Sequence, residues 1–145
     1  MYKGKKILAI VPARLGSKRL KQKNIIKVTT KKNLLNWTFD SIKKSIYLDH
    51  TILSTESNKI KNVAKKIGFE VPFMRPKNLA KDNVDSEEVI KHILSKVKIE
   101  YDYIMLLQPT SPLRNSKDID GSIKKIVDSD FNSLISISAS KFKKK

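Results

Sequence analysis

The stretch "KILAIVPARLGSKRLKQKN", residues 6–24, joins a short apolar run to a strongly basic loop. The run "KILAIV" has the length of a strand, and its continuous apolar character is typical of a buried strand in a parallel sheet. The twelve residues that follow Pro12 hold five cationic side chains and no acidic one. A loop of this kind indicates an anion site, and two anions remain open: an external polyanion, or a phosphorylated small molecule held at the sheet edge.

Strand-like and helix-like segments alternate along the rest of the chain. Apolar spacing and capping residues predict helices over residues 33–46, 57–68, 86–97 and 116–127. Apolar runs predict further strands over residues 50–55, 69–74, 101–107 and 133–138. Pro72 places the 69–74 strand at an edge or a bulge. This alternation predicts an α/β fold with a mostly parallel sheet and helices on both faces, whose site lies at the carboxyl ends of the strands.

Composition limits the class of protein. A chain of 145 residues with 39% apolar content fits one globular domain over residues 1–145. No apolar run is long enough to span a membrane, and the N-terminal run lacks the features of a signal peptide. The chain has no cysteine, which excludes disulfides and thiolate metal sites and suits a cytoplasmic protein. His50 and His92 lie too far apart to suggest a metal site.

The charge of the chain favours an anionic partner. The formal net charge is +17, and eleven lysines and arginines precede Asp40, which is the first acidic residue. This excess attracts anions without choosing between them. Aromatic residues make up only 7% of the chain, and no aromatic and basic stacking module occurs, so we expect no specific nucleic-acid partner.

The basic loop lacks both common phosphate-binding patterns, GxxxxGK[ST] and GxGxxG. It nevertheless contains suitable groups, because Gly16 lets backbone amides approach an anion and Ser17 offers a hydroxyl. The cationic side chains of the loop that could hold phosphate are Arg14, Lys18, Arg19 and Lys23. On composition alone, a solvated basic loop explains the pattern equally well.

A second loop, "LLQPTSPLR" at residues 106–114, follows another buried run. Its two prolines stiffen the backbone, Gln108 offers both a donor and an acceptor, and Arg114 can hold an anion. Read by itself, the loop is better explained as a rigid connector to the helix that begins near Ser116 than as a binding site.

Four stretches, in this order and spacing, resemble the acylneuraminate cytidylyltransferase family of CMP-sialic acid synthetases and their legionaminate and pseudaminate relatives. They are "IVPARLGSKRLKQKN", "LSTES", "RPKNLAKDN" and "LLQPTSPLR". The resemblance covers about residues 7–138 and implies a Rossmann-like nucleotide-diphospho-sugar transferase fold. It also implies a nucleotidyltransferase that moves CMP from CTP to the anomeric hydroxyl of a nine-carbon keto-sugar acid, with release of pyrophosphate. On this interpretation the basic loop is a triphosphate clamp.

The resemblance implies roles for the residues of the basic loop. Arg14 and Lys23 match the main catalytic phosphate contacts, and Lys23 is the better placed for charge at the reacting phosphate. Gly16 and Ser17 would form the floor of the loop. Asn24 would hold the region of the β- and γ-phosphates or the ribose.

Residues outside the basic loop also match the family pattern. Arg75 corresponds to a nucleotide-side arginine, and Ser86 to a serine that helps to line the cytosine pocket. Gln108 corresponds to a glutamine that faces the sugar acid, whereas Arg114 would be structural. The expected partners are therefore CTP and a sialic-type acid, with no membrane partner.

The chain departs from the family pattern inside the motifs. Leu15 stands where the family usually has glycine, Lys21 where it has proline, and Glu56 where it has aspartate. The family also continues beyond residue 138 with a dimerisation arm, much of the sugar pocket, and aspartates that hold Mg²⁺. We therefore expect a C-terminally truncated member with an exposed apolar seam. Its aspartates are interpreted as helix-start residues: Asp82, Asp85, Asp118 and Asp120.

Two alternatives remain at this point. One is a cytidylyltransferase of the 3-deoxy-manno-octulosonate type, which acts on an eight-carbon acid. The other is a catalytically inactive or partner-dependent remnant that binds CTP or polyanions, whose affinity would fall steeply with salt and show no preference for CTP. The sequence does not name the sugar acid.

Overall fold

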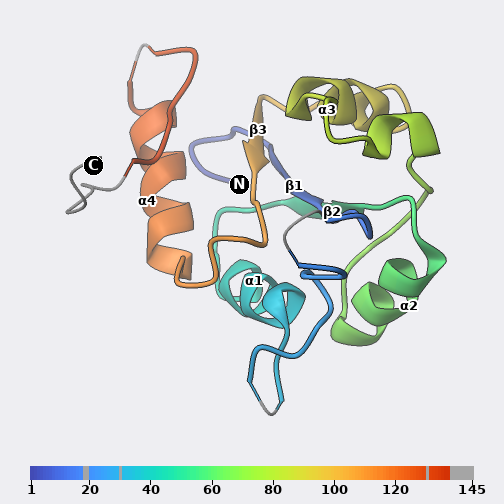
Figure 1. Ribbon diagram of the computed structural model, residues 1–145. Helices are drawn as coiled ribbons and strands as arrows, with labels where there is room; N and C mark the ends of the chain where they lie inside the picture. The colour runs from blue at the N-terminus through green and yellow to red at the C-terminus, as the bar shows by residue number, and fades with distance from the viewer. Residues whose placement is uncertain (18–19, 30, 130, 138–145) are drawn as a thin grey trace, which may run out of the picture.

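Strand β1 (Ile7–Pro12) is the centre of the fold, because its first five residues are buried. It pairs in parallel with β2 (His50–Ser54) on one side and with β3 (Tyr103–Leu106) on the other, so the strand order is β2-β1-β3 (Figure 1). This is the arrangement of a computed structural model that describes residues 1–17, 20–29, 31–129 and 131–137. The continuous apolar run thus forms the central strand that its composition predicts.

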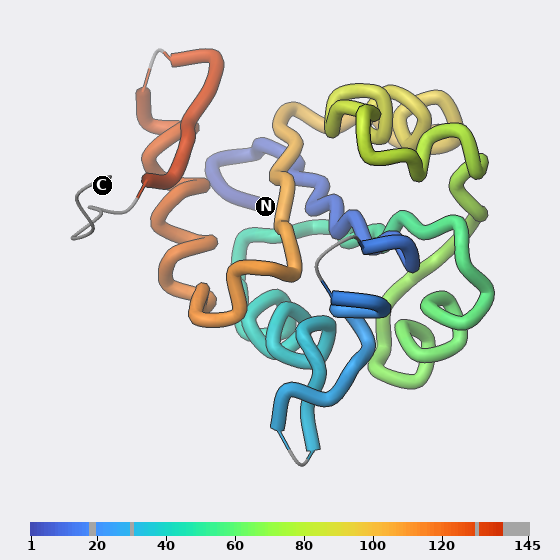
Figure 2. Tube along the Cα trace, in the orientation of Figure 1, coloured from blue at the N-terminus to red at the C-terminus, as the bar shows by residue number. Residues whose placement is uncertain are grey.

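The two outer strands are fixed at their starts by carboxylates. Asp49 accepts a hydrogen bond from the Ile7 N–H at 2.8 Å, and Asp102 accepts one from the Lys6 N–H at 2.9 Å. Asp49 also pairs with the amino group of Met1 at 3.0 Å. Figure 2 shows the N-terminal segment running between the sheet and the last helix. These contacts hold the amino ends of the strands, which leaves the carboxyl ends as the open edge.

The helices are α1 (Leu34–Lys43), α2 (Asn58–Ile67), α3 (Ser86–Leu94) and α4 (Ser116–Val127), with a short 3-10 helix at Lys77–Ala80. Local caps explain several of their boundaries. Asn33 and Asn115 each begin a helix with a capping box, and Ser57 caps α2. Gly68 ends α2 in the left-handed conformation. None of the described helices has the length and apolar character needed to cross a membrane.

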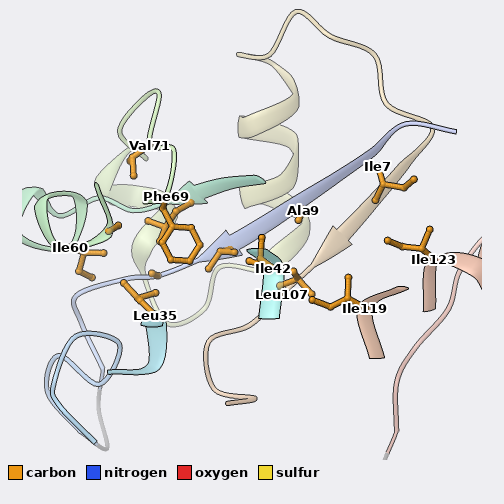
Figure 3. Close-up of a cluster of buried hydrophobic side chains, with 14 residues drawn as sticks. Ile7, Ala9, Leu35, Ile42, Ile60, Phe69, Val71, Leu107, Ile119 and Ile123 are labelled. Atoms are coloured by element: carbon orange, nitrogen blue, oxygen red, sulfur yellow. The ribbon is translucent and has the colours of Figure 1, made fainter. Parts of the chain in front are cut away.

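Alternate residues of β1 pack against opposite layers of helices. Ile7, Ala9 and Val11 belong to a cluster shared with α1, α2 and α4 (Figure 3). Leu8 and Ile10 belong to a second cluster shared with α3 on the other face. The prediction of a parallel sheet covered by helices on both faces is therefore confirmed, and the core extends along β1 on both faces of the sheet.

Some expected boundaries are wrong. The helix predicted over residues 33–46 ends at Lys43, and Ile46 is exposed although it fits the helical spacing. The helix predicted over 86–97 ends at Leu94.

Two expected strands do not form. The 69–74 segment makes one bridge, between Glu70 and Ile52, and Pro72 then removes a backbone donor from it. Of the 133–138 strand, residues 133–137 are described and pair with no strand in the described chain, while residue 138 lies outside the described residues.

Candidate functional site

A cleft of about 260 Å³ lies at the carboxyl ends of β1 and β3. The loops after these two strands form one side of it, and the segment from Arg75 to the first turns of α3 forms the other. Six of the eight residues expected at the site line it: Arg14, Lys23, Asn24, Arg75, Ser86 and Gln108. The other two, Gly16 and Ser17, line an adjoining hollow that shares Arg14 with the cleft. The described structure thus brings the residues of separate motifs to one edge of the sheet.

Arg14 reaches across the cleft to the opposite segment. Its guanidinium donates to the carbonyl oxygen of Ala80 at 3.3 Å and pairs with Asp82 at 2.5 Å. The side-chain amide of Asn24, which is buried, donates to the carbonyl oxygen of Arg14 at 3.0 Å. Asn24 therefore shapes the basic loop from within, in addition to lining the cleft.

Lys23 and Lys81 bring two further cations to the cleft. Neither forms an ion pair with a partner among the residues that the structure describes. Lys23 follows Gln22, whose φ of 56° produces a turn in which the N–H groups of Ile25 and Ile26 donate to the Gln22 carbonyl oxygen. Two unpaired ammonium groups beside Arg14 make the cleft suited to a polyanion.

Arg75 is buried at the base of the cleft, with only 4% of its side chain exposed. Its guanidinium donates to Glu56 at 3.2 Å, and its backbone N–H donates to the Thr55 carbonyl oxygen at 2.8 Å. Burial lowers the pKa of Arg75, and the Glu56 carboxylate acts in the opposite direction. Its Nε has no partner in the described chain.

Glu56 is the residue beside the cleft whose contacts sequence reasoning missed. Besides holding Arg75, its carboxylate accepts a hydrogen bond from the Leu15 N–H at 2.7 Å. The signal that could have found it is its place directly after β2, beside the loop that follows β1. Leu15, which departs from the family pattern, fits because its side chain packs against the core.

Gly16 is not required by the described fold itself. Its φ is not in the left-handed range, and a Cβ built there would meet no atom within 4 Å. Close approach of a ligand to the backbone therefore stays a prediction for this position.

The loop after β3 is fixed by its own arginine. The Arg114 guanidinium donates to the Gln108 carbonyl oxygen at 3.4 Å, and burial lowers the pKa of Arg114. The Gln108 side chain is exposed and accepts from the Thr110 hydroxyl at 3.5 Å. The contacts of Arg114 are those of a structural residue, as expected.

Ser86 opens α3 at the opposite side of the cleft. Its N-cap residue, Asp85, makes no side-chain capping bond. The first N–H groups of α3 therefore lie at the cleft without that cap, and a helix N-terminus favours negative charge.

The described residues do not form a protein cage for Mg²⁺, because they contain no group of three or more metal-ligating side chains. Asp82 was expected at a helix start, but it lines the cleft and pairs with Arg14 instead. Asp118 does belong to a capping box, and Asp120 accepts a hydrogen bond from the Ser45 hydroxyl at 2.5 Å. We therefore derive no step through a metal, and its presence with CTP stays a prediction.

Comparison with known proteins decides the family. A family model described as cytidylyltransferase matches residues 8–144. The chain belongs to the cytidylyltransferase family. The N-acylneuraminate cytidylyltransferase of Escherichia coli O18:K1:H7 is 40% identical over 119 residues, which cover 82% of this chain. The CMP-N,N'-diacetyllegionaminic acid synthase of Legionella pneumophila is 35% identical over 82% of the chain, and the pseudaminic acid cytidylyltransferase of Campylobacter jejuni serotype O:2 is 38% identical over 79%.

Solved structures show the same fold. A CMP:2-keto-3-deoxy-manno-octonic acid synthetase complexed with CTP matches 85% of the present chain, with a TM-score of 0.73 and 18% sequence identity. A cytidylyltransferase of Leptospira borgpetersenii matches 87% with a TM-score of 0.67 and 24% identity. They confirm the Rossmann-like fold class implied by the four motifs.

The chain spans only part of its relatives. It covers 28% of the length of the Escherichia coli relative, 52% of the Legionella relative and 50% of the Campylobacter relative. The two solved structures are covered to 48% and 50%.

Proposed function

We propose that this member of the cytidylyltransferase family transfers CMP from CTP to the anomeric hydroxyl of a sialic-type nine-carbon keto-sugar acid. The observation that carries the proposal is the cleft, where six residues expected from separate motifs come together. The names of the three relatives support an N-acylneuraminate, a legionaminate or a pseudaminate as the acceptor.

The proposed reaction balances without covalent participation of the protein. The anomeric hydroxyl oxygen bonds to the α-phosphorus, and the bond from that phosphorus to the α,β-bridging oxygen breaks. Pyrophosphate leaves with that oxygen, and the proton of the hydroxyl passes to water or to the departing pyrophosphate. Such a transfer depends on alignment and on positive charge near the phosphates. Arg14, Lys23 and Lys81 are the cations that would supply this charge.

The resemblance to the family supports an assignment of the base and sugar sides within the same cleft. Arg75 and Ser86 would lie on the cytosine side, and Gln108 on the side of the sugar acid. Mg²⁺ is expected from the family; the described residues contain no group of three metal-ligating side chains, and a site completed by the CTP phosphates alone would be weak. A cytoplasmic location stays a prediction for this chain, and the sequence predicts no oligomeric state for it.

Calorimetric titration of CTP and of ATP, each with Mg²⁺, tests the proposal. We expect saturable CTP binding that weakens about tenfold in Lys23→Ala, a loss of the size of one charge-assisted contact. Lys65→Ala is the matched control, since Lys65 is exposed on α2, outside the cleft. Pyrophosphate release is then measured with CTP and each candidate nine-carbon acid, and with 3-deoxy-manno-octulosonate.

Each alternative has its own outcome. Equal binding of CTP, ATP and RNA, with an affinity that falls steeply with salt, would replace the proposal with a polyanion-binding protein. Turnover only with the eight-carbon acid would move the substrate to the octulosonate class. CTP binding without turnover would assign this chain the nucleotide site and leave the transfer to a longer or partnered form.

A further inference from the structure

Glu56 joins two segments that lie far apart in the sequence. One carboxylate oxygen accepts the Leu15 N–H at 2.7 Å, across 41 positions, and the other accepts from the Arg75 guanidinium at 3.2 Å, across 19 positions. The Glu56 side chain is only 13% exposed. One largely buried carboxylate therefore connects the basic loop after β1 to the segment that forms the other side of the cleft.

Arg75 needs this carboxylate where it lies. Its side chain is 4% exposed, and a buried guanidinium without a counter-charge is strongly unfavourable. Thr55 and Glu56, consecutive residues after β2, hold the backbone and the guanidinium of Arg75 respectively. The Arg75 Nε is also buried and has no hydrogen-bond partner in the described chain, so the Glu56 carboxylate is the charged partner that the structure gives this guanidinium.

The other arginine of the cleft is held differently. The side chains of Arg14 and Asp82 are 33% and 39% exposed, so water and incoming anions reach this pair. A phosphate can replace Asp82 on Arg14, whereas the buried Glu56–Arg75 pair is too enclosed to exchange in that way. The cleft thus contains one exchangeable arginine and one fixed arginine.

We propose that Glu56 is a positioning residue that sets Arg75 and the backbone beside Arg14 in their nucleotide-binding arrangement before CTP arrives. The proposal rests on the function proposed above, and it assigns Glu56 no contact with substrate. Glu56 acts through Arg75 on the base side and through Leu15 on the phosphate side. Contacts that are already formed in the free protein raise affinity, because the side chains lose their conformational entropy during folding and not when the ligand binds.

Two substitutions separate charge from length. Glu56→Gln keeps the size and removes the charge that Arg75 requires, while Glu56→Asp keeps the charge and shortens the reach. We expect CTP affinity to fall about tenfold in Glu56→Gln and less in Glu56→Asp, which retains a charge-assisted partner. The preference for CTP over ATP should also fall in Glu56→Gln, because Arg75 is assigned to the base side of the cleft. Glu100→Gln, at an exposed glutamate outside the cleft, is the matched control and should change neither.

A double-mutant cycle tests whether Glu56 acts through Arg75. In an Arg75→Lys background, Glu56→Gln should reduce the CTP-binding free energy by less than about a third of the reduction it causes in the original chain. The reason is that substitutions at two contacting residues do not have additive effects. Additive losses in CTP affinity would overturn the proposed route through Arg75.

A third measurement needs no nucleotide. Amide hydrogen exchange at Leu15 should accelerate at least about tenfold in Glu56→Ala, because its N–H loses a buried acceptor. The amide of Ile10 in β1 should keep its protection, which shows that the variant is folded. Unchanged exchange at Leu15 overturns the positioning role. Failure of the original chain to bind CTP overturns the proposed function instead. Because the exchange measurement uses no nucleotide, it tests the positioning role separately from the proposed function.

Discussion

Gly68 is a position at which both the backbone conformation and a close neighbour disfavour a side chain. Its φ is 119°, and a Cβ there would lie 2.6 Å from the Cζ atom of Phe39. We expect Gly68→Ala to lower the free energy of unfolding by about 2 to 4 kcal/mol, from left-handed strain and overpacking together. Urea denaturation followed by circular dichroism measures this change.

Gly121 provides the matched control. It lies inside α4, and a Cβ there would meet nothing within 4 Å. Gly121→Ala should raise the free energy of unfolding by about 0.5 to 1 kcal/mol, because alanine is the better helix former. Equal losses at the two glycines would show that the tight contact at Gly68 is not the cause.

His92 predicts how stability depends on pH. Burial, together with the nearby positive charges of Lys96 and Arg75, lowers its pKa in the folded chain. The unfolded chain then binds the proton more tightly, so the contribution of His92 is present above its ordinary pKa of about 6.5 and is lost as pH falls through the lower folded value. The free energy of unfolding should therefore fall as pH drops from about 6.5 towards the lower folded pKa, and this fall should be smaller in His92→Leu. His50→Leu, at an exposed histidine, is the control, and equal slopes in both variants would contradict the assignment to His92.

At the scale of elements, the segment between the 3-10 helix at Lys77–Ala80 and α3 is connected to the basic loop through Asp82 and Arg14. The Asp82 carboxylate holds the arginine that a phosphate would need. We therefore expect Asp82→Asn to tighten CTP binding about threefold or more, since removing a competing charge-assisted contact frees Arg14.

The control for Asp82 is Asp85→Asn. It removes the same charge three positions further along and leaves the pair with Arg14 in place. If both variants tighten binding equally, general electrostatics and not release of Arg14 is responsible. Calorimetry at one fixed salt concentration compares them.

The elements that sequence predicts best are those with local boundaries. Helix α2 runs between the Ser57 cap and Gly68, and α4 begins after Asn115, as the capping and periodicity rules require. The segments 69–74 and 133–137 have equally suitable composition but form no strand. A strand depends on a neighbour that supplies backbone partners, and this information is not local.

The candidate site likewise has residues that the sequence predicted and contacts that it did not predict. The rule that loops gather at the carboxyl edge predicted that the loops of Arg14 and Gln108 meet, and only the resemblance to the family added Arg75 to them. The carboxylate partners of the two arginines, Asp82 and Glu56, were not predicted. These pairs depend on side-chain distances across segments whose relative position only the packed fold defines.

The charge of the whole molecule favours anions everywhere, so it cannot by itself locate the site. The net charge of +17 includes exposed lysines on α2 that have no part in the cleft. What distinguishes the cleft is the combination of cations with buried, fixed groups such as Asn24 and Arg75. A discriminating anion site needs such fixed groups, because mobile surface charges attract without selecting.

Exposed apolar side chains give the last prediction. Leu113 is 91% exposed, and Ile135 and Ile137 are 83% and 92% exposed. Apolar surface of this kind, if contiguous, binds other apolar surface. We expect the purified 145-residue chain to bind an apolar fluorescent dye and to self-associate as its concentration rises, in sedimentation velocity measurements.

A double variant, Ile135→Ser with Ile137→Ser, should reduce both signals without loss of stability, because the described residues 133–137 belong to no helix or strand. Ser133→Ala with Ser136→Ala is the control in the same segment and should leave both signals unchanged. A monodisperse chain without dye binding would contradict the expected apolar seam. Dye binding that persists in the isoleucine variant would instead place the apolar surface elsewhere, with Leu113 as the next residue to replace.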